Sequence, residues 1–535
     1  MPLADWASLA VFGALVLLVA ATFGNYGNGF DAALEDTYGR QIISWYASLG
    51  ADTSALHYRD LFYYGGLFDT LAALATMVSP FDRWATCHLM GGIFGLIGLA
   101  GAWKLGRHLG GPLAGFFSLA ALALMPSYYG MMFVNPKDIP FAAMTIWAVY
   151  ACTLLMENLP KPPMKLILAF GLAAGLSLAV RVGGILLFFY LGAALLLYWM
   201  TDKTGRAESM LDRWRQAGIS SLRIVVPAVA LAWIVMMAFW PWAQVDPLRH
   251  PFEALLHFSN THSNINTLFF GHEVGLTYHP ALYLPVYVAA KMPQIVIAAL
   301  AAGTALGAMA LWKNGIRQFP LRLAPVTLAA FFPLAYAVIA RPELYDADRH
   351  FIFILPPMAV LAGLAASRLA VMPQRRWASA AVAIMLIAGG GRQMQVLIDM
   401  HPYEYAAFND IVGGVKGAEG LFETEYWGTS MAEATTDLRR YIAEHQLNRP
   451  EPWRVAICGD YNQMGDQPHP ELQPTADWRH VDFFIAATRY GCDEKLPGRI
   501  IAEVGRDGVP FAVVKDVRFA KHVDNLGNGD TLSRP

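Results

Sequence analysis

The sequence is short of charge, and this excludes an ordinary soluble protein. Charged residues make up 15% of the 535 positions, whereas hydrophobic residues make up 56%. Soluble globular chains usually carry roughly 25% charged residues. The sequence also lacks a basic tract, because its net charge is −2 and its Lys and Arg residues are scattered. Proteins that bind nucleic acid concentrate positive charge, so we exclude nucleic acid as a partner.

Cysteine is scarce, and the four cysteines lack the spacing of metal ligands. Cys87 and Cys152 fall in apolar runs, whereas Cys458 and Cys492 fall in the polar C-terminal part. This last pair forms a disulfide if the segment lies in an oxidising compartment, and two isolated thiols are an equally good alternative. The sequence therefore requires no cofactor and indicates no metal, although clustered acids leave a divalent metal open.

Lys and Arg are absent before the first apolar run, and a convincing cleavage pattern is absent after it. The run is therefore expected to be a retained helix and not a secretory signal.

A membrane helix needs about 20 mostly apolar residues, and such runs recur from Trp6 to about Met394. We predict about eleven spans. Their centres are expected near Leu15, Leu96, Leu119, Trp147, Leu172, Leu191, Leu231, Leu300, Leu328, Leu361 and Ile384.

Positive charge alternates between the loops, which predicts the orientation of the chain. Loops with Lys104 and Arg107 or with Arg375 and Arg376 belong to the positively charged set, which is expected to be cytoplasmic. The other set is rich in acids and faces outward. This pattern predicts a protein of a bacterial inner (plasma) membrane, in contact with membrane lipids. Its N-terminus is cytoplasmic and its C-terminal part is periplasmic or extracellular.

The sequence predicts two domains, a transmembrane domain over residues 1–393 and an extracytoplasmic α/β domain over 394–535. The long outer loops span about 24–81 and 244–283, and the first is expected to hold a surface helix from Thr37 to Tyr46. The C-terminal part contains strand-like and helical runs before a disordered end from about Asp524. The strands are expected at Val455–Cys458, Phe483–Ala487 and Phe511–Val514, and the helix at Met431–His445.

Two acids, Asp31 and Asp138, stand at the outer ends of predicted spans and are the candidate catalytic residues. Ionisable residues beside hydrocarbon are costly unless they pair or act. Such a carboxylate can take a proton from an acceptor hydroxyl while a sugar–phosphate bond opens. The alternative is a structural role, in which Asp138 caps the following helix and Lys137 neutralises it.

Basic residues on the same side are candidates for binding a phosphate, since a phosphate leaving group needs charge-assisted contacts. These candidates are Lys137, Arg181, Lys291, Arg349 and His350. The alternatives are snorkelling to the interface for Arg181 and Lys291 and an ordinary surface ion pair with Asp346 or Asp348 for Arg349.

Several motifs in this order resemble those of a known family. They are Asp31 with Tyr38-Gly39, Tyr63-Tyr64-Gly65-Gly66-Leu67-Phe68, Asn135-Pro136-Lys137-Asp138-Ile139-Pro140, Trp240-Pro241-Trp242, Arg349-His350-Phe351, His401-Pro402-Tyr403 and Tyr426-Trp427-Gly428. The chain resembles the polyprenyl-phosphate-dependent glycosyltransferases of the GT-C superfamily. Within it, the chain is similar to the family 39 group of protein O-mannosyltransferases and lipid A aminoarabinose transferases.

The resemblance implies a GT-C type polytopic helical fold and an inverting glycosyltransferase with a polyprenyl-phosphate-linked sugar donor and a lipid, glycan or protein acceptor. It implies that Asp31 is the catalytic base, that Asp138 is the second outer-loop acid, and that Arg349 with His350 begins a late span. Members of the family usually carry an Asp-Glu pair where this chain has Asp31-Ala32. Glu35 and Asp36 are the candidates to replace the missing acid as substrate-binding residues.

A secondary transporter of a small anionic substrate is the alternative function, with Asp31 and Asp138 binding ions and Arg181 meeting the anion. Transporters usually show internal repeats, and this sequence shows none. A catalytically silent membrane scaffold is a third interpretation, favoured by Ala32.

Overall fold

The computed structural model describes residues 1–201, 210–260, 265–275, 280–315, 320–371, 376–447, 449–465 and 469–519. Within these ranges nine helices are long and apolar enough to cross a membrane. They are Leu3–Asn25, Arg83–Gly110, Asp138–Glu157, Val182–Thr201, Trp214–Ala238, Gln294–Lys313, Leu321–Ala340, Arg349–Val371 and Ser379–Met400. The prediction of a polytopic helical membrane protein is confirmed.

Every predicted span centre falls on an apolar helix, but two of these helices are not simple spans. Leu119 lies in α5 (Pro112–Ala123), which joins α6 (Pro126–Val134) at a bend of 63°. Leu172 lies in α8 (Met164–Leu178), which has 15 residues. Proline at Pro126 supplies the break, because it removes a backbone donor and disfavours helix in the preceding residue. The pattern of apolar residues thus predicted where the helices lie better than it predicted how many of them cross the membrane.

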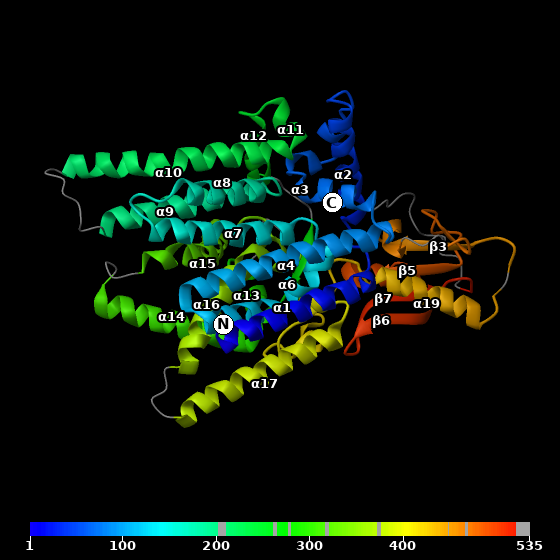
Figure 1. The fold of residues 1–535 in the computed structure, drawn as a ribbon. Helices are drawn as coiled ribbons and strands as arrows, with labels where there is room; N and C mark the ends of the chain where they lie inside the picture. Colours follow the sequence, from blue (N-terminus) through cyan, green and yellow to red (C-terminus); the bar gives the residue numbers. More distant parts are fainter. Residues whose placement is uncertain are drawn as a thin grey trace.

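The long helices run side by side and form one bundle (Figure 1). Their bounds are α1 Leu3–Thr22, α4 Arg83–Gly110, α7 Asp138–Glu157, α9 Leu186–Thr201, α10 Met210–Ala238, α14 Gln294–Asn314, α15 Ala324–Ala340, α16 Leu355–Val371 and α17 Arg376–Met400. At one end of α1, Asp5 accepts two hydrogen bonds from Arg107 of α4, at 2.7 and 2.9 Å. This ion pair joins the first two long helices.

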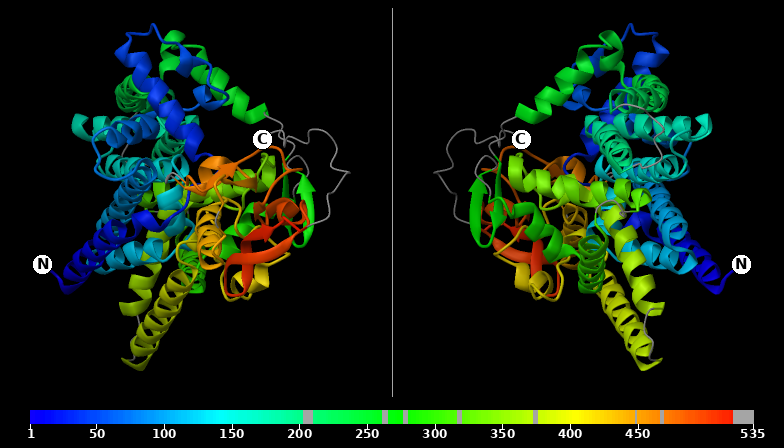
Figure 2. Two further views of the ribbon diagram at one scale, coloured as in Figure 1. Left: turned by 90° about the vertical axis from the view of Figure 1, so that its right-hand side faces the viewer. Right: turned by 90° about the vertical axis from the view of Figure 1, so that its left-hand side faces the viewer.

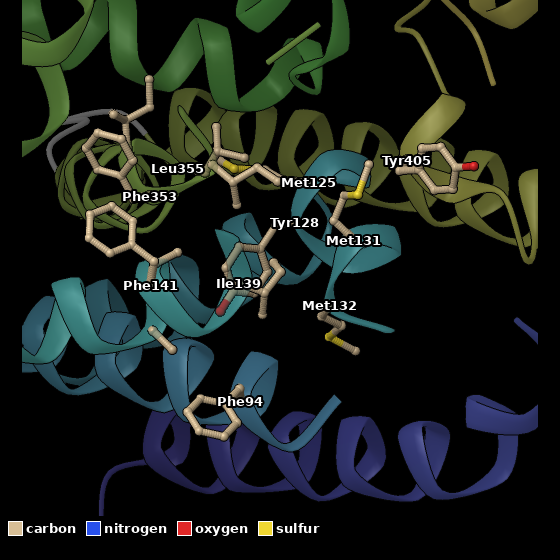
Figure 3. Close-up of a cluster of buried hydrophobic side chains, with 14 of the residues drawn as sticks. Phe94, Met125, Tyr128, Met131, Met132, Ile139, Phe141, Phe353, Leu355 and Tyr405 are labelled. Atoms are coloured by element: carbon tan, nitrogen blue, oxygen red, sulfur yellow. The ribbon is translucent and has the colours of Figure 1, made fainter. Parts of the chain in front are cut away.

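The core of the bundle is a cluster of apolar side chains from α4, α6, α7 and the start of α16 (Figure 3). Helices in membranes pack closely where one of them presents small residues. Gly98 of α4 is such a residue, since a Cβ there would lie 1.9 Å from the Tyr128 hydroxyl. Tyr128 donates a hydrogen bond to the Gly95 carbonyl at 2.9 Å. This packing fixes α6 and, directly after it, the loop that carries Asn135, Lys137 and Asp138.

Shorter elements cover the end of the bundle that bears the C-terminal domain. The first long loop contains α2 (Ala32–Ala47), which includes the predicted helix from Thr37 to Tyr46, and α3 (Leu67–Thr76). The second contains α11 (Pro241–Val245), α12 (His250–Asn260) and a hairpin that was not predicted from the sequence. The hairpin pairs β1 (Asn266–Phe269) with β2 (His272–Gly275), and α13 (Tyr283–Lys291) follows it.

The C-terminal domain is a five-stranded mixed sheet in the order β4-β3-β5-β7-β6, covered by α19 (Met431–Glu444) (Figures 1 and 2). The predicted strands correspond to β3 (Trp453–Cys458), β5 (Phe483–Ala487) and β7 (Val509–Asp516). These are the buried inner strands, with β3 parallel to β5 and β5 antiparallel to β7. The edge strands β4 (Leu472–Pro474) and β6 (Arg499–Arg506) are short or more polar, and neither was predicted from the sequence.

The segment between the bundle and the sheet includes the short helix α18 (Gly414–Ala418). Cys458 and Cys492 form a disulfide, so the first of the two alternatives for this pair is correct. The predicted disordered end from Asp524 lies outside the described residues.

Candidate active site

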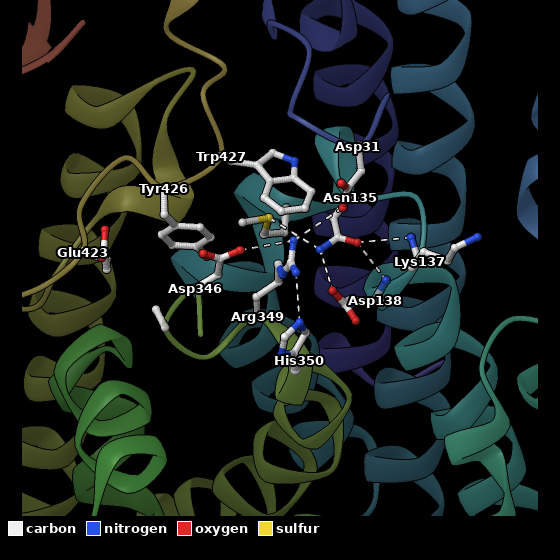
Figure 4. A network of polar contacts seen from close by, with 12 residues as sticks. Asp31, Asn135, Lys137, Asp138, Asp346, Arg349, His350, Glu423, Tyr426 and Trp427 are labelled. Atoms are coloured by element: carbon white, nitrogen blue, oxygen red, sulfur yellow. Dashed lines mark hydrogen bonds and ion pairs between the residues drawn. The ribbon is translucent and has the colours of Figure 1, made fainter. Parts of the chain in front are cut away.

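Charged side chains from distant stretches of sequence meet where the bundle adjoins the C-terminal domain (Figure 4). They come from the exit of α1, from α2 and α3, from the start of α7, from the residue before the short 3₁₀ helix Val182–Ile185, and from the 3₁₀ helix Arg349–Ile354. The segment with Tyr426 and Trp427 lies beside them (Figure 4). The structure therefore brings Asp31 and Asp138 into one cluster, as expected from the sequence.

Asp31 stands directly before the first residue of α2 and is the accessible acid of the cluster. Its side chain is 45% exposed, and its carboxylate lies 3.7 Å from Nη1 of Arg349. Protein atoms nevertheless surround it closely, and this desolvation raises its pKa above the ordinary value of 3.8, although the charge of Arg349 acts in the opposite direction. Asp31 is thus a reachable carboxylate with increased basicity.

Arg349 is buried at the start of its 3₁₀ helix and connects several parts of the site. It lies 3.4 Å from Asp346 and 4.2 Å from the centre of the Trp427 ring, and it donates to Nε2 of His350 at 2.9 Å. The Gly-rich exit of α1 permits this arrangement, because a Cβ on Gly29 would lie 2.1 Å from the Trp427 ring nitrogen. Charge and an aromatic face therefore both hold the guanidinium.

Asp138 is oriented by a turn that its own sequence motif makes. The Asn135 side chain accepts hydrogen bonds from the backbone N–H groups of Lys137 and Asp138, at 3.1 and 2.8 Å, and donates to the Asp138 carboxylate at 2.8 Å. Arg181 pairs with the same carboxylate at 2.9 Å. Asp138 is the first residue of α7 and does not cap it, so the capping alternative is wrong.

Lys137 is buried and holds two other acids instead of neutralising Asp138. Its ammonium lies 2.6 Å from Glu35 and 2.8 Å from Asp69. Burial alone would lower the pKa of Lys137, but the two carboxylates raise it. Desolvation and the charge of Asp69 raise the pKa of Glu35 well above 4.5, against the attraction of Lys137. The contact joins α2, α3 and the loop before α7.

The two candidates to replace the missing acid point in different directions. Glu35 lies one helical turn after Asp31 and turns toward Lys137, whereas Asp36 pairs with Arg40 at 2.9 Å and Arg83 at 3.5 Å. Asp36 therefore belongs to an ion-pair group that fastens α2 to the start of α4.

Lys291 also departs from the expected phosphate-binding group. Its ammonium donates to the Tyr405 carbonyl and lies 4.8 Å from the Phe408 ring centre. Burial lowers the pKa of Lys291 to about 8, and Asp348 partly opposes this. Lys291 is fully buried in the protein, so it does not snorkel to the interface. The surface ion pair proposed for Arg349 exists with Asp346, but it is buried.

Other residues of the site had no role assigned from the sequence. Asn135 and Trp427 belong to motifs of the family resemblance, which was the available signal for them. Asp69 is one of the many acids in the outward-facing loops and has no feature that distinguishes it from the others. Arg489, which pairs with Asp346, lies in the C-terminal domain and had no signal at all.

Several buried donors at the site have no hydrogen-bond partner within the described part of the chain. They are Nε of Arg181, Nε of Arg349 and the hydroxyl of Tyr426. Buried polar groups are normally paired, and Arg donors suit phosphate and carboxylate groups. The described residues contain no group of three or more His, Cys, Asp or Glu side chains that could hold a metal ion. The arrangement thus offers one accessible carboxylate beside donors suited to an anion.

Comparisons with known proteins give a structural likeness and no family assignment. No family model matches the chain, and no curated protein matches it. ArnT from Cupriavidus metallidurans bound to undecaprenyl phosphate is similar over 100% of both chains, with 13% identity and a TM-score of 0.48. The apo form of that ArnT is similar over 95% of this chain and 97% of its own, with 16% identity and a TM-score of 0.43.

An archaeal enzyme gives a likeness of the same order. The Archaeoglobus fulgidus oligosaccharyltransferase in the apo form is 13% identical, with a TM-score of 0.46 over 85% of this chain and 63% of its own.

Proposed function

We propose that this protein transfers a sugar from a polyprenyl-phosphate donor to a lipid, glycan or protein acceptor at the extracytoplasmic membrane face. The observation that carries the proposal is the contrast between Asp31 and its acidic neighbours. The side chain of Asp31 is 45% exposed, whereas those of Glu35, Asp69, Asp138 and Asp346 are 1–6% exposed and paired with cations. One base is accessible, and the other acids position cations.

The chemistry follows from these positions. Asp31 takes the proton of an acceptor hydroxyl as the hydroxyl oxygen attacks the anomeric carbon of the donor sugar. The bond between that carbon and the phosphate oxygen breaks, the oxygen keeps the electron pair, and polyprenyl phosphate leaves. Arg349 and Arg181 stabilise the negative charge that develops on the phosphate. A single displacement of this kind inverts the anomeric configuration.

The remaining site residues have supporting roles in this proposal. Asn135 and Arg181 orient Asp138, whose carboxylate in turn fixes Arg181. Lys137 fastens α2 through Glu35 and so determines where Asp31 stands. His350 accepts a hydrogen bond from Arg349 and limits its orientation.

The experiment supplies purified protein in lipid with a panel of polyprenyl-phosphate sugars and acceptors and measures glycoside formation. Asp31→Asn is expected to lose activity by a factor of about 10²–10⁴, since it removes a general base and keeps the shape of the side chain. Asp60→Asn is the matched control, because Asp60 is an exposed acid of the same long loop.

The outcomes separate the functions. Loss of turnover in Asp31→Asn, with folding retained and Asp60→Asn active, supports the assignment. Unchanged turnover in Asp31→Asn places the base elsewhere. Uptake of a substrate into sealed vesicles without any glycoside product would favour the transporter.

A further inference from the structure

Arg489 belongs to the C-terminal domain but lies within the charged cluster of the membrane domain. It follows β5 and begins the 3₁₀ helix Arg489–Glu494. Its side chain is 8% exposed, and arginine is rarely so buried unless it is paired. Its two terminal nitrogens donate to Asp346 and to the Tyr426 carbonyl.

The first route from Arg489 to Arg349 passes through Asp346. Nη2 of Arg489 donates to one oxygen of Asp346, and Arg349 lies 3.4 Å from the other. Asp346 therefore stands between two arginines that come from different domains. Its backbone φ is 57° and that of Ala347 is 60°. Aspartate tolerates this left-handed conformation, but it is unfavourable for alanine and persists where surrounding contacts impose it.

The second route passes through the residue pair Tyr426 and Trp427. Nη1 of Arg489 donates to the Tyr426 carbonyl at 2.6 Å. The next residue, Trp427, covers the Arg349 guanidinium and donates its ring N–H to the Val134 carbonyl at 3.0 Å. The planar fork of a single arginine thus fixes both the anionic and the aromatic partner of Arg349.

We propose that Arg489 is a positioning residue, which holds Arg349 in place for the donor phosphate through Asp346 and through the backbone of Tyr426. The inference rests on the proposed function for its effect on catalysis, and on contacts alone for its effect on Arg349. It makes the C-terminal domain a structural part of the donor site. The substitution Arg489→Lys would preserve this role only in part, since the ammonium of a lysine cannot reproduce the fork of a guanidinium.

The test compares the full-length variants Arg489→Gln, Arg489→Lys and Arg506→Gln. Arg506 is a matched control, because it also joins the C-terminal domain to the bundle. It donates to the His401 carbonyl at 2.9 Å and pairs with Glu433 at 3.2 Å, partners that differ from those of Arg489. The first measurement is hydrogen–deuterium exchange of the peptide covering residues 343–350, which requires no activity. Arg489→Gln is expected to raise its exchange rate on the order of tenfold over the Arg506→Gln value.

The second measurement is steady-state transfer with a polyprenyl-phosphate sugar. Arg489→Gln is expected to raise the KM for the donor about tenfold while kcat changes less, with Arg489→Lys between it and the wild type. When Arg489→Gln is combined with Asp346→Asn, the increase in the donor KM is expected to be smaller than the product of the two single increases, because both substitutions act on the same contact.

Equal exchange rates in Arg489→Gln and Arg506→Gln overturn the inference. Increased exchange in an enzyme whose donor KM is unchanged overturns it as well. If the wild type transfers no sugar to any acceptor, the proposed function fails, while the exchange measurement still decides whether Arg489 positions the Arg349 segment.

Discussion

Replacement of Lys137 by Met tests whether the buried ammonium holds α2 against the rest of the site. The change keeps most of the side-chain length and removes the charge. Glu35 and Asp69 are then left without the cation that lies within 2.8 Å of both. Their side chains are 6% and 1% exposed, so bulk water compensates poorly for the lost contact. The variant should therefore destabilise the membrane domain.

The magnitude follows from the burial of the three groups. Removing one partner from a buried ion pair lowers the free energy of unfolding by about 3–5 kcal/mol, because it leaves an uncompensated charge in an environment of low polarity. Here one cation serves two carboxylates, so the upper part of that range applies at neutral pH. Replacing one acid as well, in Lys137→Met with Glu35→Gln, should recover part of the loss, since one buried charge disappears together with the cation.

The pH dependence has a definite sign. Desolvation raises the pKa of Glu35 above 4.5, and loss of the Lys137 charge raises it further. Between 4.5 and the raised pKa the folded state binds a proton that the unfolded state does not bind, so stability falls as pH rises. The destabilisation by Lys137→Met should therefore be smaller at pH 5 than at pH 8.

Thermal unfolding in detergent, followed by tryptophan fluorescence at both pH values, measures this effect. Lys416→Met is the control, because Lys416 is an exposed lysine on α18. Midpoints of Lys137→Met that equal those of Lys416→Met at both pH values would refute the role given to the ammonium.

Three further predictions concern activity and the C-terminal domain. Because the pKa of Asp31 is raised, the acidic limb of kcat/KM should lie at higher pH than the ordinary value of 3.8, and a pH–rate profile measures it. Arg349→Lys should lower kcat/KM by about 10²-fold despite its retained charge, since a lysine loses the fork and the stacking on Trp427; equal kcat/KM in titrations of the donor would contradict this. Replacing Cys458 and Cys492 by Ala should destabilise the C-terminal domain by about 2–4 kcal/mol, and denaturant unfolding of the oxidised wild type and the double variant compares them.

The bundle was predictable because membrane helices are specified by local composition. Any run of about 20 apolar residues must satisfy its backbone internally, so hydropathy alone finds it. Pro126 is a local signal for a break in one such run, but hydropathy does not give the 63° bend, which depends on how Tyr128 and its neighbours pack on α4. Buried inner strands of the C-terminal sheet were likewise visible as apolar runs, whereas the polar edge strand Arg499–Arg506 was not.

The site was predictable only in part, because its residues meet through long-range contacts. Four charged residues could be chosen one by one from the sequence, because they stand at the ends of apolar runs: Asp31, Asp138, Arg181 and Arg349. Most of their pairing could not be predicted, because only the fold brings Arg181 to Asp138 and Arg349 to Asp31. The exception is the pair of Arg349 with Asp346, three residues before it, which the sequence offered as a local ion pair. Lys137 shows the difficulty, because its neighbour in sequence is Asp138, yet its ammonium binds Glu35 and Asp69.

The energetics of the cluster favour a functional origin over a structural one. Well-packed apolar residues of similar volume generally stabilise a fold as well as a buried ion pair does, or better. The protein nevertheless keeps Lys137, Arg181 and Arg349 beside hydrocarbon-spanning helices, and it leaves buried donors of two of these arginines without a protein partner among the described residues. Such a cluster stabilises the folded state poorly but is ready to receive an anion without rearrangement. The proposed reaction assigns the base to Asp31, whose exposed carboxylate lies 3.7 Å from Arg349.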